Sequence, residues 1–173
     1  MSGGRSYWKG DYVDGPVAPL YPFGHGLSYT TFELGSPSVA PDVVTWNDEV
    51  SVEIEVANTG QRDGEEVVQL YVRDPQASVT RPVLELKGFT RVEVVAGASK
   101  RITFRLPVGQ LGFYDRHLRY VVEPGEIEVM VGTSSQDLVH AGMFTVIADP
   151  SGPPVKRFEG TVAVADLGTD SGT

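Results

Sequence analysis

The sequence contains no cysteine, fewer basic than acidic residues, and no long apolar run. Without cysteine, disulfides, zinc–thiolate centres and cysteine nucleophiles are excluded. The 14 lysines and arginines are outnumbered by 23 aspartates and glutamates, and the net charge of −9 disfavours nucleic acid and anionic membrane surfaces as partners. No stretch reaches the roughly 18 apolar residues of a membrane-spanning helix. The sequence therefore predicts a globular protein that binds neither nucleic acid nor membrane.

Residues with catalytic or metal-binding chemistry are also scarce. The three histidines are His25, His117 and His140, and no two of them have the spacing of metal ligands. The Gly-x-Ser-x-Gly turn of a serine hydrolase is missing. Carboxylates are plentiful, but many alternate with apolar residues, as Glu53 and Glu55 do, and this is the pattern of a solvated strand face. We expect no metal, no cofactor and no catalytic residue in this chain.

The residues that are abundant favour an all-β fold. Glycine and proline together number 32, which is typical of a turn-rich chain. Apolar residues alternate with polar ones in several short segments, and no amphipathic helix is evident. Seven or eight short strands, each with one apolar face, predict an antiparallel two-sheet β-sandwich. The clearest strands are expected at 50–56, 68–72, 84–94, 102–106, 127–131 and 143–147.

Composition divides the chain into three parts. Residues 1–28 form a glycine-rich loop arm, 29–148 the sandwich, and 149–173 a linker or flexible tail that has room for one extra strand at 161–165. The arm is too short to hold a core of its own. Its aromatic residues therefore either stack on sugar rings or pack against another domain, and we expect them to be exposed in this chain alone. These residues are Tyr7, Trp8 and Tyr12.

Several segments together resemble one known family. The segment PLYPFGHGLSYTTF at 19–32 is similar to the stretch leading into the C-terminal domain of family 3 glycoside hydrolases of the β-glucosidase and β-xylosidase type. The resemblance extends over residues 3–147 and implies a fibronectin type III-like sandwich, related to the immunoglobulin fold. Further matching segments follow in the same order, namely VQLYVRD at 68–74, RPVLELKGF at 81–89, FYD at 113–115, EPG at 123–125 and VGTSS at 131–135.

The resembling segments also suggest how the domain packs. We expect Tyr71, Leu86 and Phe89 to fill the gap of about 10 Å between the two sheets, because they are large residues on predicted strands. Four apolar residues of the arm are expected to anchor it against the sandwich. They are Tyr21, Phe23, Leu27 and Tyr29.

The resemblance implies a function without catalysis. In this family a barrel domain carries the aspartate nucleophile, within a Ser-Asp-Trp stretch, and an α/β domain supplies the acid/base glutamate. Neither domain nor that stretch is present, so no catalytic residue can be assigned. The chain is thus expected to be a stabilising, interface-forming accessory domain or fragment, whose partners are the catalytic domains of a β-glycosidase, in cis or in trans. A free-standing carbohydrate-binding module is the alternative, and it would need a row of exposed aromatic residues.

The N-terminal segment carries the only candidate contacts with substrate. Residues 2–11, SGGRSYWKGD, resemble a loop that lies mid-chain in a bacterial subgroup of the family, which suggests a truncated gene, a split gene or an excised fragment. By that position, Arg5, Trp8 and Lys9 are candidates for contact with sugar or with a neighbouring domain. The lack of cysteine and of a signal-peptide-like stretch favours a bacterial, cytoplasmic protein, although the compartment stays open.

Overall fold

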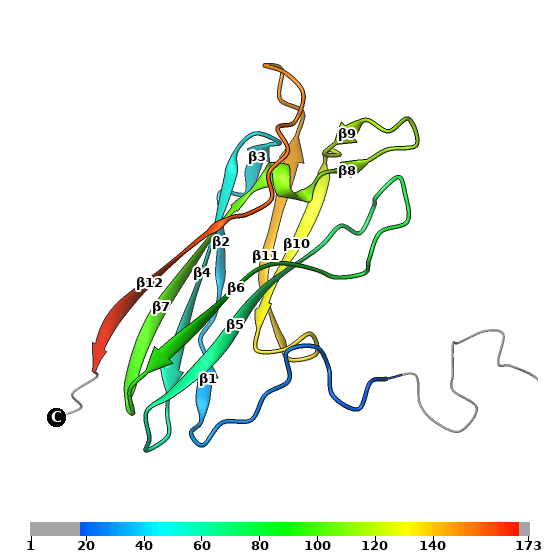
Figure 1. Ribbon diagram of the computed structural model, residues 1–173. Helices are drawn as coiled ribbons and strands as arrows, with labels where there is room; N and C mark the ends of the chain where they lie inside the picture. The colour runs from blue at the N-terminus through cyan, green and yellow to red at the C-terminus, as the bar shows by residue number, and fades with distance from the viewer. Residues whose placement is uncertain (1–17, 170–173) are drawn as a thin grey trace, which may run out of the picture.

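The computed structural model describes residues 18–169, which form a two-layer arrangement of β-strands (Figure 1). In these residues the only helical element is a single 3₁₀ turn, η1. The elements in chain order are β1 (Phe32–Leu34), β2 (Ser38–Ala40), β3 (Val43–Thr45), β4 (Glu49–Asn58), β5 (Gly64–Arg73), β6 (Glu85–Val94), β7 (Ala98–Pro107), η1 (Val108–Leu111), β8 (Phe113–Tyr114), β9 (Tyr120–Val121), β10 (Gly125–Gly132), β11 (Leu138–Ile147) and β12 (Thr161–Thr169).

The first sheet is built around the antiparallel pair β4 and β7. Its strand order is β1-β4-β7-β12, and β2 pairs with the same side of β4 as β1 does. The apolar residues of the central strands meet in register, so one face of this sheet is continuously apolar. The aligned pairs are Val50 with Leu106, Val52 with Phe104, and Ile54 with Ile102.

The second sheet has the order β3-β11-β10-β5-β6. All of its neighbours are antiparallel except β3 and β11, which run parallel. The chain enters this sheet from β2 of the first sheet, so the N-terminal strands connect the two layers. Strands β8 and β9 form a separate short hairpin at one end of the sandwich (Figure 1).

The core lies between the two sheets and consists almost wholly of aliphatic residues. Alternate residues of β4, β5, β7 and β10 point inward, as expected for strands with a period of two. Phe104 and Phe144 are the largest fully buried side chains. The other buried core residues on these and neighbouring strands include Val50, Val52, Ile54, Val56, Val68, Leu70, Val72, Val92, Val94, Ile102, Leu106, Ile127, Val129, Val131 and Val146.

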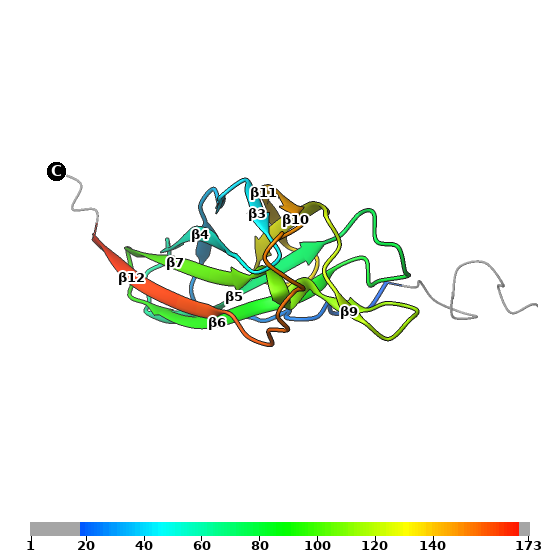
Figure 2. The same ribbon diagram turned by 90° about the horizontal axis from the view of Figure 1, so that it is seen from above.

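The predicted two-sheet sandwich is confirmed, with one correction at its C-terminal end. The tail was expected to be flexible, with at most a five-residue strand, but β12 has nine residues and pairs with β7 from Ala98 to Arg105. The free side of β7 offers backbone donors and acceptors along this whole length, so the added strand continues as far as its partner. Figure 2 shows β12 at the outer rim of the first sheet, beside β7.

The expected filling of the inter-sheet gap by Phe89, Leu86 and Tyr71 is wrong. Phe89 pairs with Gln69, which lies between the inward-facing Val68 and Leu70, so its ring points to the outer face. The inward position beside it is Gly88, and the Phe104 ring occupies the space there, 3.2 Å from where a Cβ would stand. Leu86 pairs with Tyr71 on that outer face, and Tyr71 is buried but lies outside the core cluster.

No helix among residues 18–169 is long and apolar enough to cross a membrane. The described part of the chain also contains no group of three or more histidine, aspartate or glutamate side chains placed to hold a metal ion.

Candidate functional site

The described part of the N-terminal arm, residues 18–29, crosses below the turn that joins β10 to β11 before entering β1 (Figure 1). One backbone hydrogen bond fixes it there: Ser135 N–H donates to the Phe23 carbonyl at 2.9 Å. A tight turn follows, in which His25 N–H donates to the Pro22 carbonyl at 3.0 Å and the His25 ring stacks on Tyr21, with 5.1 Å between ring centroids. The arm is thus held through its backbone rather than through its apolar side chains.

A buried glutamine on β5 forms the floor under this turn. Gln69 points away from the core, donates from Nε2 to the Thr133 carbonyl at 2.8 Å, and accepts from the Tyr71 hydroxyl at 2.6 Å. Gly24 lies directly above it with a φ of +83°, and a Cβ at this position would stand 2.1 Å from the Gln69 amide nitrogen. Only glycine satisfies both the left-handed backbone and the close approach.

A second buried amide fixes Thr30, the residue that follows the arm. Asn58 accepts at Oδ1 from the Thr30 hydroxyl at 2.7 Å and from Gly60 N–H at 3.1 Å. Its Nδ2 donates to the carbonyls of Arg62 at 2.7 Å and Val94 at 2.8 Å. One side chain therefore connects Thr30 at the end of the arm, the β4–β5 turn and the end of β6, and all of its hydrogen-bonding capacity is used.

The apolar side chains of the arm face solvent, contrary to the expectation that they anchor it. We call these residues the arm surface, and their exposed fractions range from 67 to 95 %. On the outer face of β6, Phe89 is also mostly exposed, and its cross-strand neighbour is the Gln69 that supports the arm. Apolar side chains on a fixed backbone and open to water are characteristic of an interaction surface. The arm surface consists of Leu20, Tyr21, Phe23, Leu27 and Tyr29.

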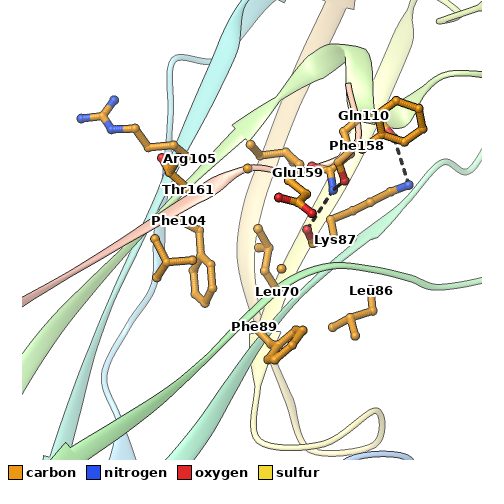
Figure 3. A pocket seen from close by; sticks show the side chains of 14 residues that line it. Leu70, Leu86, Lys87, Phe89, Phe104, Arg105, Gln110, Phe158, Glu159 and Thr161 are labelled. Carbon is orange, nitrogen blue, oxygen red and sulfur yellow. Dashed lines mark hydrogen bonds between the residues drawn. The ribbon is translucent and has the colours of Figure 1, made fainter. Parts of the chain in front are cut away.

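A groove of about 320 Å³ opens between the edge strands β6 and β12 (Figure 3). Its floor includes the core residues Leu70 and Phe104. At one end Lys87 Nζ donates to the Gln110 carbonyl at 3.2 Å, and Gln110 Nε2 donates to the Lys87 carbonyl at 3.1 Å. The buried Gln110 Oε1 has no hydrogen-bond partner in the described structure. Glu159 is the one acidic residue lining the groove, so it offers no pair of carboxylates for glycoside hydrolysis.

Two glutamates elsewhere have shifted pKa values, and both shifts have structural causes. Burial raises the pKa of Glu66, the Val67 N–H opposes this, and the nearby charge of Asp137 adds to the rise. Burial also acts to raise the pKa of Glu85, but hydrogen bonds and charges from Lys87 and Arg81 outweigh it, so that pKa is lowered. Glu66 lines a small hollow beside the arm turn, whereas Glu85 belongs to an ion-pair cluster.

The predicted contact residues Arg5, Trp8 and Lys9, with Tyr7 and Tyr12, lie outside the described residues. The histidines are apart from one another: His25 lies in the arm turn, His117 accepts from Arg116 Nε at 3.3 Å, and His140 is exposed on β11.

The structurally important amides Asn58 and Gln69 were not anticipated from the sequence. For Gln69 the sequence did contain an indication of burial. It is an uncharged polar residue inside the apolar string VVQLYV, whereas a strand face exposed to water would be expected to carry a charged residue there.

The chain is similar in sequence to one domain family and to part of several glycosidases. The fibronectin type III-like domain family matches residues 66–135. A β-xylosidase from Formosa agariphila is 44 % identical over 74 % of this chain, and the thermostable β-glucosidase B of Acetivibrio thermocellus is 40 % identical over 90 % of it. The matched regions are only 18 % and 20 % of those proteins. The chain thus spans about a fifth of the length of the curated relatives it matches.

Solved structures of β-glucosidases also match this chain over about a fifth of their own length. A β-glucosidase from Erythrobacter marinus matches with a TM-score of 0.74 and 42 % identity, covering 79 % of this chain and 18 % of that one. The β-glucosidase of Listeria innocua, in complex with isofagomine, matches with a TM-score of 0.74 and 40 % identity, covering 83 % of this chain and 20 % of the other. At these identities the likeness extends to sequence as well as fold.

Proposed function

Because the chain belongs to the fibronectin type III-like domains of family 3 glycoside hydrolases, we propose that it is a non-catalytic accessory domain that forms an interface with catalytic domains. The observation that supports this most directly is the arm surface: its five large apolar side chains are exposed. The backbone that carries them accepts a hydrogen bond from Ser135, packs closely on Gln69 at Gly24, and is followed by the hydrogen bond from Thr30 to Asn58. A surface of this kind is stabilised when another protein covers it. The partner is a family 3 catalytic domain, supplied in cis or in trans.

Two further observations support a non-catalytic role. The matched regions are about a fifth of each relative, which leaves most of an enzyme of this kind outside this chain. The groove beside β12 is lined mainly by apolar residues and holds a single carboxylate. We therefore propose that hydrolysis, with β-glucosides or β-xylosides as substrates, belongs to the assembled enzyme and requires the other domains.

The role of the N-terminal segment remains part of this proposal. Arg5, Trp8 and Lys9 precede the arm surface by a dozen or so residues, so they are suited to contact either the neighbouring domain or a bound sugar. The free-standing carbohydrate-binding alternative has less support. The exposed aromatic residues of the described chain are spread over the arm, β6, β8 and the segment before β12, instead of forming one flat row.

A domain replacement tests the proposal. The chain is grafted into the Listeria innocua β-glucosidase in place of the segment it matches, with and without the triple change Leu20→Ser, Leu27→Ser, Tyr29→Ser. We expect the triple change to lower the melting temperature of the graft by several degrees, because the covered apolar area is lost, while leaving that of the isolated chain unchanged. The matched control is Val83→Ser, which changes an apolar residue 77 % exposed between β5 and β6.

The outcomes separate the alternatives. Equal melting temperatures for the parent and triple-variant grafts would contradict the interface. In parallel, the isolated chain is expected to hydrolyse no aryl β-glucoside or β-xyloside, and turnover that survives removal of host glycosidases would contradict the non-catalytic role. Binding of cello- or xylo-oligosaccharides by the isolated chain would favour the carbohydrate-binding alternative.

A further inference from the structure

Strand β12 leaves one of its backbone edges open. On one side it pairs with β7 over residues Thr161 to Thr169, and within residues 18–169 no strand pairs with its other side. An open strand edge presents a row of unpaired N–H and C=O groups that can template another strand. Natural proteins therefore protect such edges unless they are used.

The other edges of this sandwich carry recognisable protection. The edge strands β1, β2 and β3 have only three residues each. Strand β6 carries four charged residues, its pairing with β5 is irregular beside Leu70, and the Gln110 amide caps its Lys87 carbonyl. Short strands, charges and bulges are the usual devices against edge pairing. Strand β12 is also a long edge strand, but its first five residues contain neither a charge nor a bulge.

The sequence of β12 is suited to pairing with the same strand of a second copy. Residues 161–165 read TVAVA, with no charge, and all of them are exposed. Val162 and Val164 pair with Phe104 and Ile102 of β7, so they face the same side as the core, yet they remain 37 % and 45 % exposed. The strand therefore presents an open backbone edge together with an uncovered apolar face.

The segment before β12 fixes the strand in position although its side chains are exposed. Trp46 Nε1 donates to the Gly152 carbonyl at 2.8 Å, and Val155 N–H donates to Asn47 Oδ1 at 2.9 Å. Lys156 Nζ then lies between three aromatic rings, 4.8 Å from the centroid of Tyr114, 5.0 Å from Phe158 and 5.4 Å from Tyr120. These contacts hold β12 at the rim of the sheet and its free edge outward.

We propose that β12 is a homodimerisation edge, at which a second copy of this chain adds its own β12 in antiparallel orientation. A two-fold axis at Ala163 forms an isologous contact in which each strand supplies the same residues. Val162 then lies opposite Val164 of the partner subunit, which covers the exposed valines of both chains. Asp166 lies opposite glycine 160 of the other copy, so no like charges face each other across the pair.

Sedimentation equilibrium over a range of concentrations tests this contact. The wild-type mass is expected to rise from 18.7 kDa toward twice that value. Ala163→Lys places two ammonium groups opposite each other and should weaken the dimer by about fivefold or more. Thr103→Lys is the control, because Thr103 is the β7 partner of Ala163 and receives the same charge one strand inward.

Cross-linking tests the register independently. The chain contains no cysteine, so Ala163→Cys introduces a single thiol, and directly opposed residues have the separation that a disulfide needs. We expect oxidation to give a covalent dimer for Ala163→Cys and little for Thr103→Cys. A wild-type chain that stays monomeric, a dimer equally unaffected by both lysine changes, or equal cross-linking of both cysteine variants would overturn the proposal. None of these results depends on whether the arm surface contacts a catalytic domain.

Discussion

Two buried amide side chains determine how the arm meets the sandwich. Gln69 and Asn58 are each buried and each uses its amide nitrogen to bind backbone carbonyls from other segments. Buried polar groups of this kind stabilise a structure only while every partner is present, because an unsatisfied group inside a protein is costly. The apolar residues of the arm are consequently free to face outward.

Replacement of Asn58 by alanine provides a test at this scale. Asn58→Ala leaves the Arg62 and Val94 carbonyls and the Gly60 N–H without partners, and we expect the free energy of unfolding to fall by about 3 kcal/mol. Urea denaturation measures this change. Gln136→Ala, at an exposed position, should shift the free energy of unfolding by less than about 0.5 kcal/mol. A similar small shift for Asn58→Ala would show that the amide is not important for stability.

At the scale of elements, β12 differs from the other long strands. Strands β4 and β7 place alternate side chains in the core, whereas the side chains described on β12 are exposed. Its position depends on the backbone ladder with β7 and on the segment before it, where Lys156 meets three aromatic rings. A strand held in this way opens locally more easily than one that contributes to the core.

Hydrogen exchange on a lysine variant tests this dependence. Lys156→Ala removes the cation–π contacts, which contribute about 1 kcal/mol at an exposed site, so the amides of β12 should exchange about fivefold faster. The amides of β4 are expected to keep their wild-type rates, because the core is unchanged. Lys156→Arg retains the cation and should restore slow exchange in β12. If β12 exchanges at the same rate in all three proteins, the aromatic cluster does not hold it.

For the whole molecule, stability comes from the aliphatic core between the sheets, and the outer face is left for contacts. Two phenylalanines make the distinction, one on the inner strand β7 of the first sheet and one on the edge strand β6 of the second. Phe104 is 1 % exposed beneath Gly88, while Phe89, the next residue after that glycine, is 65 % exposed. The same side-chain type is therefore part of the core in Phe104 and part of the exposed outer face in Phe89.

This pair gives a prediction for the whole fold. Phe104→Ala should lower the free energy of unfolding by about 3–5 kcal/mol, since it removes a buried ring and leaves a cavity between the sheets. Phe89→Ala should change it by less than about 0.5 kcal/mol, because that ring is mostly in water already. Thermal and chemical denaturation of the two variants measure the difference. Comparable losses for both would place Phe89 in the core and contradict the observed strand orientation.

The sequence by itself determined the all-β class and most of the core. Alternation of apolar and polar residues at 50–56, 102–106 and 127–131 assigns each side chain to a face, because successive residues of a strand point to opposite sides. The motif at 19–32 likewise indicated the family, since its residues match as a string and need no three-dimensional context.

Tertiary structure decided what lies on each outer face. Period-two reasoning could not place Phe89, since the irregular pairing near Leu70 and the space taken by Phe104 settle which residue of the Lys-Gly-Phe string points inward. Nor could the residue types of the arm show whether its apolar side chains point inward, because the arm is held by hydrogen bonds to residues 58 and 135 and by close packing on Gln69, all far along the chain. The length of β12 depended on the free edge of β7. Such long-range contacts exist only once the two sheets have assembled.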